Sequence, residues 1–415
     1  LHARVKVREV LIESNVLVGT SLVDMYAKCD SLTKAQEMLD ELPIRDVISW
    51  NVIITGYVHR GYGEEALMCY EQMQWEGLSP NVVTFVCILK ACGIIGALDN
   101  GRQVHARIDI DGFLGQNIFL GNALIDMYTK CGSLSKAHLV FCNLPVRDLV
   151  SWNSIIAGHV QHGHGQEALN CFHRMYIDDI SPNAFTYVSG LRACSKLRVI
   201  HRGQIFHSDI AKKGYERDAY ICSALVDMYC KCDFLEEAHG LVDHMPSRDI
   251  SWTALISGYA DRGLYEEAYI CFEEMQQEGV YPDVVVWNSM ILSYAEIDCE
   301  KALKLYGQLQ EQGVLPDSRI FVSTLKACGE AVALETGKKF HSMISRVVSG
   351  TSEVVLTNAL VDMYGRCGSI EEAENVLSES SQYCGLVAHN AMLSVYIEKG
   401  QAENALNLFN DIQKE

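Results

Sequence analysis

Proline is scarce in this sequence, and basic residues are outnumbered by acidic ones. Only seven prolines occur in 415 residues, and 34 Lys and Arg residues stand against 53 Asp and Glu residues, for a net charge of −19. Non-specific binding to a polyanion depends on neutralising its phosphates with Lys and Arg. The composition therefore argues against a protein that coats nucleic acid regardless of sequence. Any nucleic acid would have to meet a local basic stripe.

The sequence also lacks a long apolar run and a strand-like alternation. Its most apolar window, VVTFVCILKACGIIGAL from Val82, contains Lys90 and two glycines, so it indicates a pair of buried helices and no membrane span. No segment keeps the period-two alternation of a half-buried strand. With 49% apolar and 21% charged residues, the composition favours a folded chain over a disordered one. We therefore expect an all-α protein that does not cross a membrane.

The sequence repeats itself. The string NALIDMYTKCGS from Asn122 has near copies in TSLVDMYAKCDS from Thr20, SALVDMYCKCDF from Ser223 and NALVDMYGRCGS from Asn358. Variants of VSWN, and of LKAC or LRAC, recur between these copies. Such repetition indicates an array of stacked repeats rather than a single globular core.

These strings divide the chain into short, standard and long repeats. The short repeats, which contain DMY, are 16–46, 118–148, 219–249 and 354–385. The standard repeats, opened by VSWN-like strings, are 47–81, 149–183, 250–283, 284–317 and the partial 386–415. The long repeats are 82–117, 184–218 and 318–353, and residues 1–15 end a further, partial repeat. Because the chain begins and ends inside a repeat, we expect residues 1–415 to be an internal piece of one continuous array.

Each repeat is predicted to form two helices. In the standard repeats, spacings of four and three place apolar residues such as Ala66, Tyr70 and Met73 on one helical face. Gly77, and its counterparts in other standard repeats, is expected to end the second helix. All seven prolines lie within the last four residues of a repeat, where a helix does not have to continue. The pattern predicts an all-α solenoid of helix-turn-helix repeats.

Many of the sixteen cysteines occupy fixed repeat positions. One position is held by Cys29, Cys131, Cys232 and Cys367, and another by Cys92, Cys194 and Cys328. Equivalent residues of successive repeats are spread along a solenoid, so they are not natural disulfide partners. We interpret them as small buried thiols that pack helices in a reducing compartment.

The succession of short, standard and long repeats, with VSWN, DMYxKCG and LKACG strings, resembles the PLS subclass of plant pentatricopeptide repeat proteins over essentially all 415 residues. Tetratricopeptide repeats are also helical hairpins, but they have a uniform length of about 34 residues and another signature. The resemblance implies a right-handed α-solenoid whose first helices line a groove for single-stranded RNA, with one repeat per base. It also implies an RNA that runs parallel to the chain and a location in mitochondria or chloroplasts.

The resemblance further implies that the fifth and the last residue of a repeat read the base. Asp only accepts hydrogen bonds and, at the last position, should favour U or G, which carry a ring N–H donor, whereas Asn can donate and should favour C or A. In the family's code, Asn at the fifth position selects pyrimidines, and Thr or Ser selects purines. The resulting pairs are Thr20 with Asp46 (G), Asn51 with Asn81 (C), Asn122 with Asp148 (U), Asn153 with Asn183 (C), Ser223 with Asp249 (G), Thr253 with Asp283 (G) and Asn288 with Asp317 (U).

No base is assigned to the remaining repeats. The long repeats carry Val86, Val188 and Val322 at the fifth position, which have no hydrogen-bonding side chain. Asn358 pairs with Gly385, which departs from the pattern, and the partner of Asn390 lies beyond the chain. Thr253 is assigned by aligning SWT with SWN, because the repeat from Ile250 is one residue short. The reading, parallel to the chain, is G-C-n-U-C-n-G-G-U-n, followed by two unspecified positions.

Two further sets of residues each have two interpretations. In the family, the second residue of a repeat wedges between bases; here the set is mostly apolar, and the alternative is ordinary core packing. This set is Leu17, Ile48, Val83, Phe119, Val150, Phe185, Tyr220, Val285, Val355 and Val387, with Arg319 as the exception. A basic residue recurs near the end of the first helix of each short repeat, at Lys28, Lys130, Lys231 and Arg366. These side chains face phosphates, complement the negative end of the helix, or do both.

Catalytic and metal-binding motifs are missing. PLS proteins often carry a cytidine deaminase domain that needs HxE and CxxC around zinc, and neither pattern occurs here. Cys230 and Cys232 form CxC without a second pair, unlike a zinc site. The run HVQHGHG, with His159, His162 and His164, aligns with YVHRGYG and is interpreted as a turn between helices. We therefore expect no enzyme activity, metal or cofactor in this segment, while a catalytic domain outside it stays open.

The leading hypothesis is an RNA-specificity factor for organellar RNA processing, with C-to-U editing as the process. Deamination would come from a domain outside the segment or from an editing partner. The alternative is a protein-interaction scaffold of the tetratricopeptide type. A scaffold would place no constraint on the fifth residue, whereas all nine short and standard repeats have Asn, Thr or Ser there.

Overall fold

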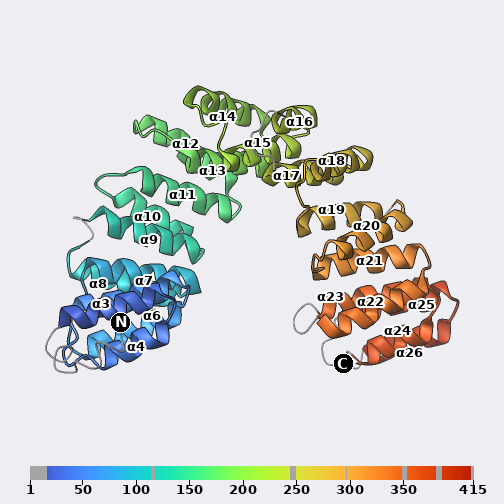
Figure 1. Ribbon diagram of the computed structural model, residues 1–415, viewed down its shortest axis with the longest axis horizontal. Helices are drawn as coiled ribbons and strands as arrows, with labels where there is room; N and C mark the ends of the chain where they lie inside the picture. Colours follow the sequence, from blue (N-terminus) through green and yellow to red (C-terminus); the bar gives the residue numbers. More distant parts are fainter. Residues whose placement is uncertain are drawn as a thin grey trace. The chain divides into compact units, whose positions relative to one another are not determined.

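The computed structural model describes residues 16–113, 117–243, 249–295, 297–347, 353–379 and 386–412. Within these ranges every regular element is an α-helix (Figure 1). The chain divides into two compact units, Leu1–Lys213 and Gly214–Glu415, and each is a stack of helical hairpins. The predicted all-α solenoid of helix-turn-helix repeats is confirmed for each unit. That all 415 residues form one continuous array stays a prediction.

In the N-terminal unit, each repeat contributes a first and a second helix. The first helices are α3 (Val16–Lys28), α5 (Val47–His59), α7 (Val82–Ile95), α9 (Ile118–Lys130), α11 (Leu149–Gln161) and α13 (Ala184–Leu197). The second helices are α4 (Leu32–Asp40), α6 (Gly63–Trp75), α8 (Leu98–Ile110), α10 (Leu134–Asn143), α12 (Gly165–Ile177) and α14 (Ile200–Lys213).

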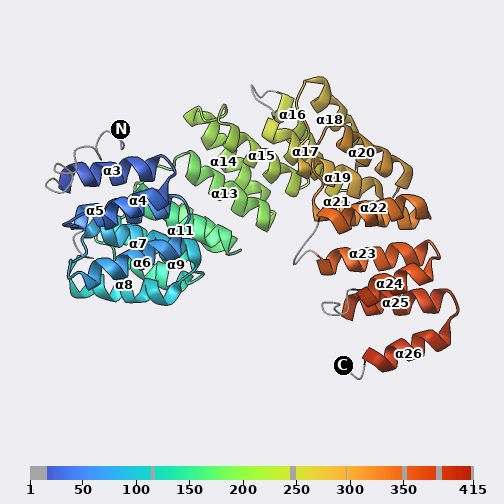
Figure 2. The same ribbon diagram turned by 60° about the horizontal axis from the view of Figure 1, so that its bottom comes forward.

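The C-terminal unit has the same organisation, and Figure 2 shows α19 to α26 following one another in sequence order. Its first helices are α15 (Ala219–Lys231), α17 (Asp249–Asp261), α19 (Val284–Ala295), α21 (Ser318–Glu330), α23 (Glu353–Arg366) and α25 (Leu386–Glu398). Its second helices are α16 (Leu235–Asp243), α18 (Tyr265–Gln277), α20 (Cys299–Glu311), α22 (Leu334–Val347), α24 (Ile370–Glu379) and α26 (Ala402–Ile412).

The first helices form a continuous layer inside each unit. Every first helix contacts the first helix of the next repeat, from α3 to α13 and from α15 to α25. From α4 to α12, each second helix of the N-terminal unit contacts the first helices on both sides of it. Equivalent residues on successive first helices are therefore neighbours in space, which is the arrangement that a one-residue-per-repeat readout requires.

The helices begin where side-chain caps are available. Asp46 and Asn183, each the residue before a first helix, accept hydrogen bonds from the backbone N–H groups of Ser49 and Thr186. Such caps satisfy a donor that has no partner inside the helix. Gly77 follows the end of α6 with a φ of +78°, a left-handed conformation that glycine adopts without steric cost. The expected stop at Gly77 is confirmed.

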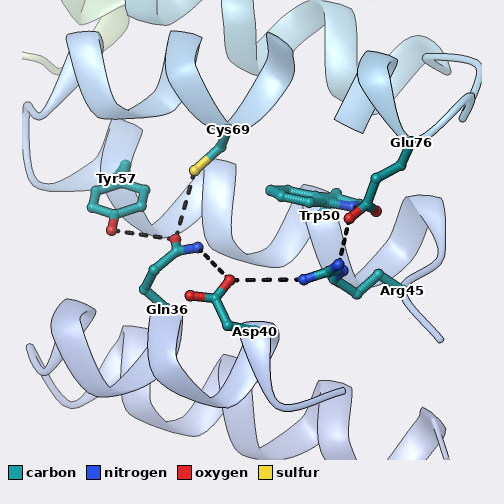
Figure 3. A network of polar contacts seen from close by, with 7 residues as sticks. All are labelled: Gln36, Asp40, Arg45, Trp50, Tyr57, Cys69 and Glu76. Carbon is teal, nitrogen blue, oxygen red and sulfur yellow. Dashed lines mark hydrogen bonds and ion pairs between the residues drawn. The ribbon is translucent and has the colours of Figure 1, made fainter. Parts of the chain in front are cut away.

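Polar contacts between repeats fix the entry into α5. Figure 3 shows Arg45, just before the cap residue Asp46, between the carboxylates of Asp40 on α4 and Glu76 at the end of α6. Arg45 Nη2 lies 2.6 Å from Glu76 Oε1 and Arg45 Nη1 lies 3.8 Å from Asp40 Oδ1. Trp50 Nε1 donates to Glu76 Oε2 at 2.9 Å. The network joins the short repeat 16–46 to the standard repeat 47–81.

The repeated cysteines lie at contacts between first helices. Cys92 and Cys328 are fully buried, and burial raises their thiol pKa values to about 11 and about 12, so both stay protonated at neutral pH. Cys131 and Cys367 approach the carbonyl oxygens of Cys92 and Cys328, with Sγ 3.6 Å from each. Cys29 is exposed, so the expected buried thiol is wrong there, and Cys131 and Cys367 are only half-buried. The physical reason is that the sulfur of Cys29 has no contact among the described residues like those of Cys131 and Cys367 with the preceding first helix.

No described helix combines the length and the apolar character that crossing a bilayer requires.

Candidate functional site

A groove with a volume of about 700 Å³ runs over α3, α5 and α7. It is lined by the second residues Ile48 and Val83, by the fifth residue Asn51 and by the last residue Asn81. Lys28, from the end of α3, lines the same groove. The structure thus brings together all the kinds of residue that the sequence singled out, from three successive repeats.

The fifth and last residues of a repeat meet through a hydrogen bond in four of the described pairs. Asn51 Nδ2 donates to Asn81 Oδ1 at 3.1 Å, and Asn153 Nδ2 donates to Asn183 Oδ1 at 3.3 Å. The other two pairs have an acidic acceptor: Asn122 Nδ2 donates to Asp148 Oδ1 at 3.1 Å, and Thr253 Oγ1 donates to Asp283 Oδ2 at 3.5 Å. The fifth residue lies in the first turns of its own helix, and the last residue lies one repeat-length later in the chain.

The last residues also cap the following helix. The carboxylate of Asp148 accepts from Ser151 N at 2.9 Å, and that of Asp283 accepts from Val286 N at 2.8 Å. The side chain of Asp317 accepts from the backbone N–H groups of Arg319 and Ile320. Capping holds each of these side chains at the start of the next first helix. Successive first helices are in contact, which brings Asp148 and Asp283 to the fifth residues of their own repeats.

Not every pair is joined. In the described part of the chain no hydrogen bond links Thr20 to Asp46 or Asn288 to Asp317, although Asp46 and Asp317 both cap their helices. The side chain of Asp249 and the whole of Gly385 lie outside the described residues, so the partners of Ser223 and Asn358 are not placed. Asn390 is exposed on α25.

The helix starts give the register of the shortened repeat. Thr253 is the fifth residue of α17, as Asn51 is the fifth residue of α5. Trp252 Nε1 donates to Glu278 Oε2 at 3.3 Å, the same contact that Trp50 makes with Glu76. However, α17 begins at Asp249 itself, whereas α5 begins one residue after Asp46. The shortened repeat therefore lacks its residue before Trp252, and Asp249 lies at the first helical position.

The second residues of the repeats project into solvent. Ile48 is 63% exposed, Val83 52% and Phe119 71%. More than half of the side chain is also exposed at Leu17, Val150, Phe185, Tyr220, Val285, Val355 and Val387. Arg319, the exception in sequence, is exposed as well. The interpretation as ordinary core packing is wrong, because the fourth residues, such as Trp50 and Trp152, occupy the core positions on these helices.

The basic row is paired with the acidic residue of the DMY motif. Lys28, Lys130 and Lys231 lie 2.7–2.8 Å from Asp24, Asp126 and Asp227, each four residues earlier. Arg366 Nε lies 2.9 Å from Asp362 in the same way, and its guanidinium also contacts Glu330. All four lie in the last turn of a first helix. The (i, i+4) spacing in the sequence could have revealed these ion pairs.

Beneath the reading pairs lies a set of bonds that the sequence analysis missed. Thr84 Oγ1 donates to Asn51 Oδ1 at 2.7 Å, and Thr186 Oγ1 donates to Asn153 Oδ1 at 2.7 Å. By contrast, Oδ1 of Asn122, Asn288 and Asn358 is buried and accepts no hydrogen bond from the described protein. The asparagine amides are therefore held in two different ways.

The histidine run behaves as a turn, as the alignment indicated. It ends α11 and opens α12, and His162 Nε2 lies 2.7 Å from the carbonyl oxygen of Thr129. A different group, His239, Cys271 and Glu274, has ligand atoms within 4.8 Å of one another. Burial and the nearby Glu274 and Asp243 carboxylates raise the pKa of Cys271 to about 12, so its thiol is protonated at neutral pH and a metal would have to displace that proton.

Together these features define a class: stacked helical hairpins that line a groove with exposed apolar side chains and paired polar ones. A family model for the PPR repeat matches residues 20–47, 122–149, 220–250, 355–382 and 387–415. A second, described as the PPR repeat family, matches residues 45–93, 147–196 and 249–296. The chain belongs to the pentatricopeptide repeat family.

Similar proteins come from plants. A chloroplastic pentatricopeptide repeat-containing protein of Arabidopsis thaliana is 35% identical over 97% of this chain and 59% of its own length. A mitochondrial one from the same plant is 29% identical over 91% of this chain and 43% of its own length. The chain thus spans about half the length of the curated relatives it matches.

Among solved structures, the pentatricopeptide repeat protein PPR10 from maize has a similar fold. It gives a TM-score of 0.66 at 19% identity, covering 96% of this chain and 64% of that one. The structure of PPR10 in complex with an 18-nt psaJ RNA element gives a TM-score of 0.52 at 15% identity, covering 96% of this chain and 79% of that one.

Proposed function

We propose that this chain binds single-stranded RNA through the layer of first helices, with one base at each short or standard repeat. The observation that carries this proposal is the groove over α3, α5 and α7, where two exposed apolar side chains and one polar pair line the same space. Ile48 and Val83 offer surfaces for the two faces of a base, and Asn51 with Asn81 offers hydrogen-bonding groups for its edge. Unpaired bases are recognised by such a combination of stacking and edge contacts.

The proposed recognition follows the chemistry of the last residue. The Asp148 carboxylate accepts only, so it suits the ring N–H of U or G, whereas the Asn81 amide can donate to the ring nitrogen of C or A. The proposed target is G-C-n-U-C-n-G-G-U-n, read parallel to the chain. The RNA-bound maize PPR10 supports RNA as the ligand class, because that protein shares this fold.

The proposed process is C-to-U editing of a mitochondrial or chloroplast transcript. The succession of short, standard and long repeats supports it, and the organelle names of the similar Arabidopsis proteins support the location. In this proposal the chain selects the RNA. A deaminase domain or an editing partner supplies the chemistry.

The proposal is tested by comparing two RNAs in a gel-shift titration at one salt concentration. One RNA carries GCNUCNGGUN, and the other has the same bases in scrambled order. We expect the first RNA to bind more tightly, since each mismatched base removes an edge contact. Equal affinities would contradict the base assignments, and no binding to either RNA would contradict the proposed function.

A further inference from the structure

Two buried threonines lie directly under the two Asn–Asn pairs. Thr84 and Thr186 are each the third residue of the helix that follows such a pair, and both are fully buried. Thr84 Oγ1 lies 2.7 Å from Asn51 Oδ1 and 3.1 Å from Asn81 Oδ1. Thr186 Oγ1 lies 2.7 Å from Asn153 Oδ1 and 2.8 Å from Asn183 Oδ1. Each hydroxyl therefore touches both amides of its pair.

The backbone N–H of Thr84, together with the number of available protons, sets the direction of the bonds around Asn81. A threonine hydroxyl has one proton to donate, and an asparagine amide has an acceptor oxygen and a donor nitrogen. The oxygen of Asn51 faces the Thr84 hydroxyl, so its nitrogen faces Asn81. The oxygen of Asn81 then receives Asn51 Nδ2 and the backbone N–H of Thr84. The remaining group, the Nδ2 donor of Asn81, is the one left for a ligand in the groove.

In the described pairs whose last residue is an aspartate, no hydroxyl of the next helix bonds to the two reading side chains. The third residue is Ser151 after Asp148, and its hydroxyl donates to the backbone carbonyl of Asp148 instead of a side chain. Ser49 does the same with the carbonyl of Asp46. After Asp283 and Asp317 the third residues are Val286 and Ile320, which have no hydroxyl.

A physical difference between aspartate and asparagine explains why only the Asn–Asn pairs have a threonine hydroxyl beneath them. The two oxygens of a carboxylate are equivalent, so an aspartate presents an acceptor whichever way it turns. An asparagine presents a donor in one orientation and an acceptor in the other. Only the asparagine needs a neighbour that distinguishes its two ends. The difference is not a property of long repeats as such, because the long repeat 318–353 follows Asp317 and carries Ile320.

We propose that Thr84 and Thr186 are positioning residues that lock the amides of Asn81 and Asn183 with their donors toward the RNA, and so make the second and fifth positions prefer C over U. This inference rests on the proposed function. It adds a residue outside the fifth and last positions, in the next repeat, to what determines the base. Without the hydroxyl, the fifth asparagine is no longer oriented, and only the backbone N–H of Thr84 or Thr186 still holds the oxygen of the last asparagine. The last asparagine then turns its oxygen outward more readily and accepts from the ring N–H of U.

The test measures the ratio of affinities for RNAs with C or U at the second base. Thr84→Val keeps the branched shape and the backbone N–H but removes the hydroxyl. We expect the ratio to fall about tenfold, with binding to C weakened and binding to U strengthened. A loss of structure alone would weaken both. Thr84→Ser restores the hydroxyl and should restore the ratio, and Thr186→Val should act at the fifth base in the same way.

Ser151→Ala is the matched control. It removes a fully buried hydroxyl at the equivalent position of its repeat, next to an aspartate, and should leave the preference for U at the fourth base unchanged. An unchanged C-to-U ratio in both threonine variants would overturn the lock, as would failure of Thr84→Ser to restore it. An unmutated chain that binds both RNAs equally would instead overturn the base reading itself, which separates the two failures.

Discussion

At the scale of single residues, the base-reading proposal depends on side chains that are held firmly before any ligand arrives. Asn122 is only 8% exposed, and its Nδ2 lies 3.1 and 3.4 Å from the two oxygens of Asp148. Its buried Oδ1 accepts no hydrogen bond from the described protein. A buried acceptor without a partner is costly, so a ligand donor that reaches it gains correspondingly.

Changing the fifth residue should change the base. Asn122→Thr recreates the Thr–Asp combination found at Thr253 and Asp283, and we expect the fourth base to shift from U toward G. The change in discrimination should be about 1–3 kcal/mol, the usual range for one base contact. It is measured by titrating RNAs that differ only at the fourth base. Asn153→Thr is the control, because it should act at the fifth base alone; an unaltered fourth-base preference in Asn122→Thr removes Asn122 from the readers.

The exposed apolar residues predict a separation between binding and stability. Phe119→Ala removes the ring of a residue that is 71% exposed, so the melting temperature should hardly move, while RNA affinity should fall. The loss should be about 1–3 kcal/mol, as for one base stacked on an aromatic ring. Phe141→Ala is the comparison, since its ring is buried against Trp152 with the centroids 4.6 Å apart. That change should cost about 3–5 kcal/mol of folding free energy. A wedge role for Phe119 is contradicted if its removal leaves RNA affinity intact.

At the scale of helices and repeats, equivalent positions in the sequence are not equivalent in the structure. Trp50 and Trp152 are both the fourth residue of a standard repeat, and both are buried. Trp50 Nε1 donates to Glu76, whereas Trp152 Nε1 has no hydrogen-bond partner among the described residues. The residue aligned with Glu76 is Asp178, whose shorter side chain contacts Arg147 instead.

This difference gives a prediction for the stability of the hairpin that two helices of one repeat form. Trp50→Phe removes a hydrogen bond to a charged acceptor, and Trp152→Phe removes none. We expect the first variant to lose about 1.5–3 kcal/mol more folding free energy than the second, the usual worth of a hydrogen bond to a charged group. Denaturant unfolding of both variants measures it. Equal losses would mean that the bond to Glu76 adds nothing to the contact between α5 and α6.

At the scale of the whole molecule, the proposed RNA binding has to overcome a net charge of −19. Lys28, which lines the groove, and its equivalent Lys130 are already engaged, since they pair with Asp24 and Asp126. These pairs are partly exposed, so each is weak and a phosphate can compete for the cation. Binding should therefore depend only modestly on salt for an RNA of this length.

The role of the basic row is tested at Lys130. Lys130→Ala should weaken binding to all RNAs about equally and reduce the slope of log affinity against log salt by about 1. Asp126→Asn should have the opposite effect, because it frees the same ammonium group. Lys136→Ala, which removes an exposed charge from α10, is the control and should leave the slope unchanged. If Lys130→Ala behaves like Lys136→Ala, Lys130 does not contact phosphate.

Much of the fold could be predicted from the sequence because the sequence repeats itself. A single helix boundary is hard to place, but strings that recur, such as DMYxKC, place many boundaries at once, and α5, α7, α9 and α11 begin at the first residue of their repeats. The proline positions and the glycine stops added independent local constraints. The assignment of Thr253 depended on the same alignment, and the position of Trp252 in α17 gives the same register.

By itself, the sequence determined the helical hairpins, their order and the identity of the fifth and last residues, because these follow from local periodicity. The tertiary structure decided what depends on residues far apart in the chain. Ile48 is apolar but exposed, since stacking places the fourth residue, and not the second, in the core. The bond from Thr84 to Asn51 joins residues of successive repeats, and it exists because α5 and α7 pack together. No local pattern carries that contact, on which the proposed orientation of Asn81 toward the groove depends.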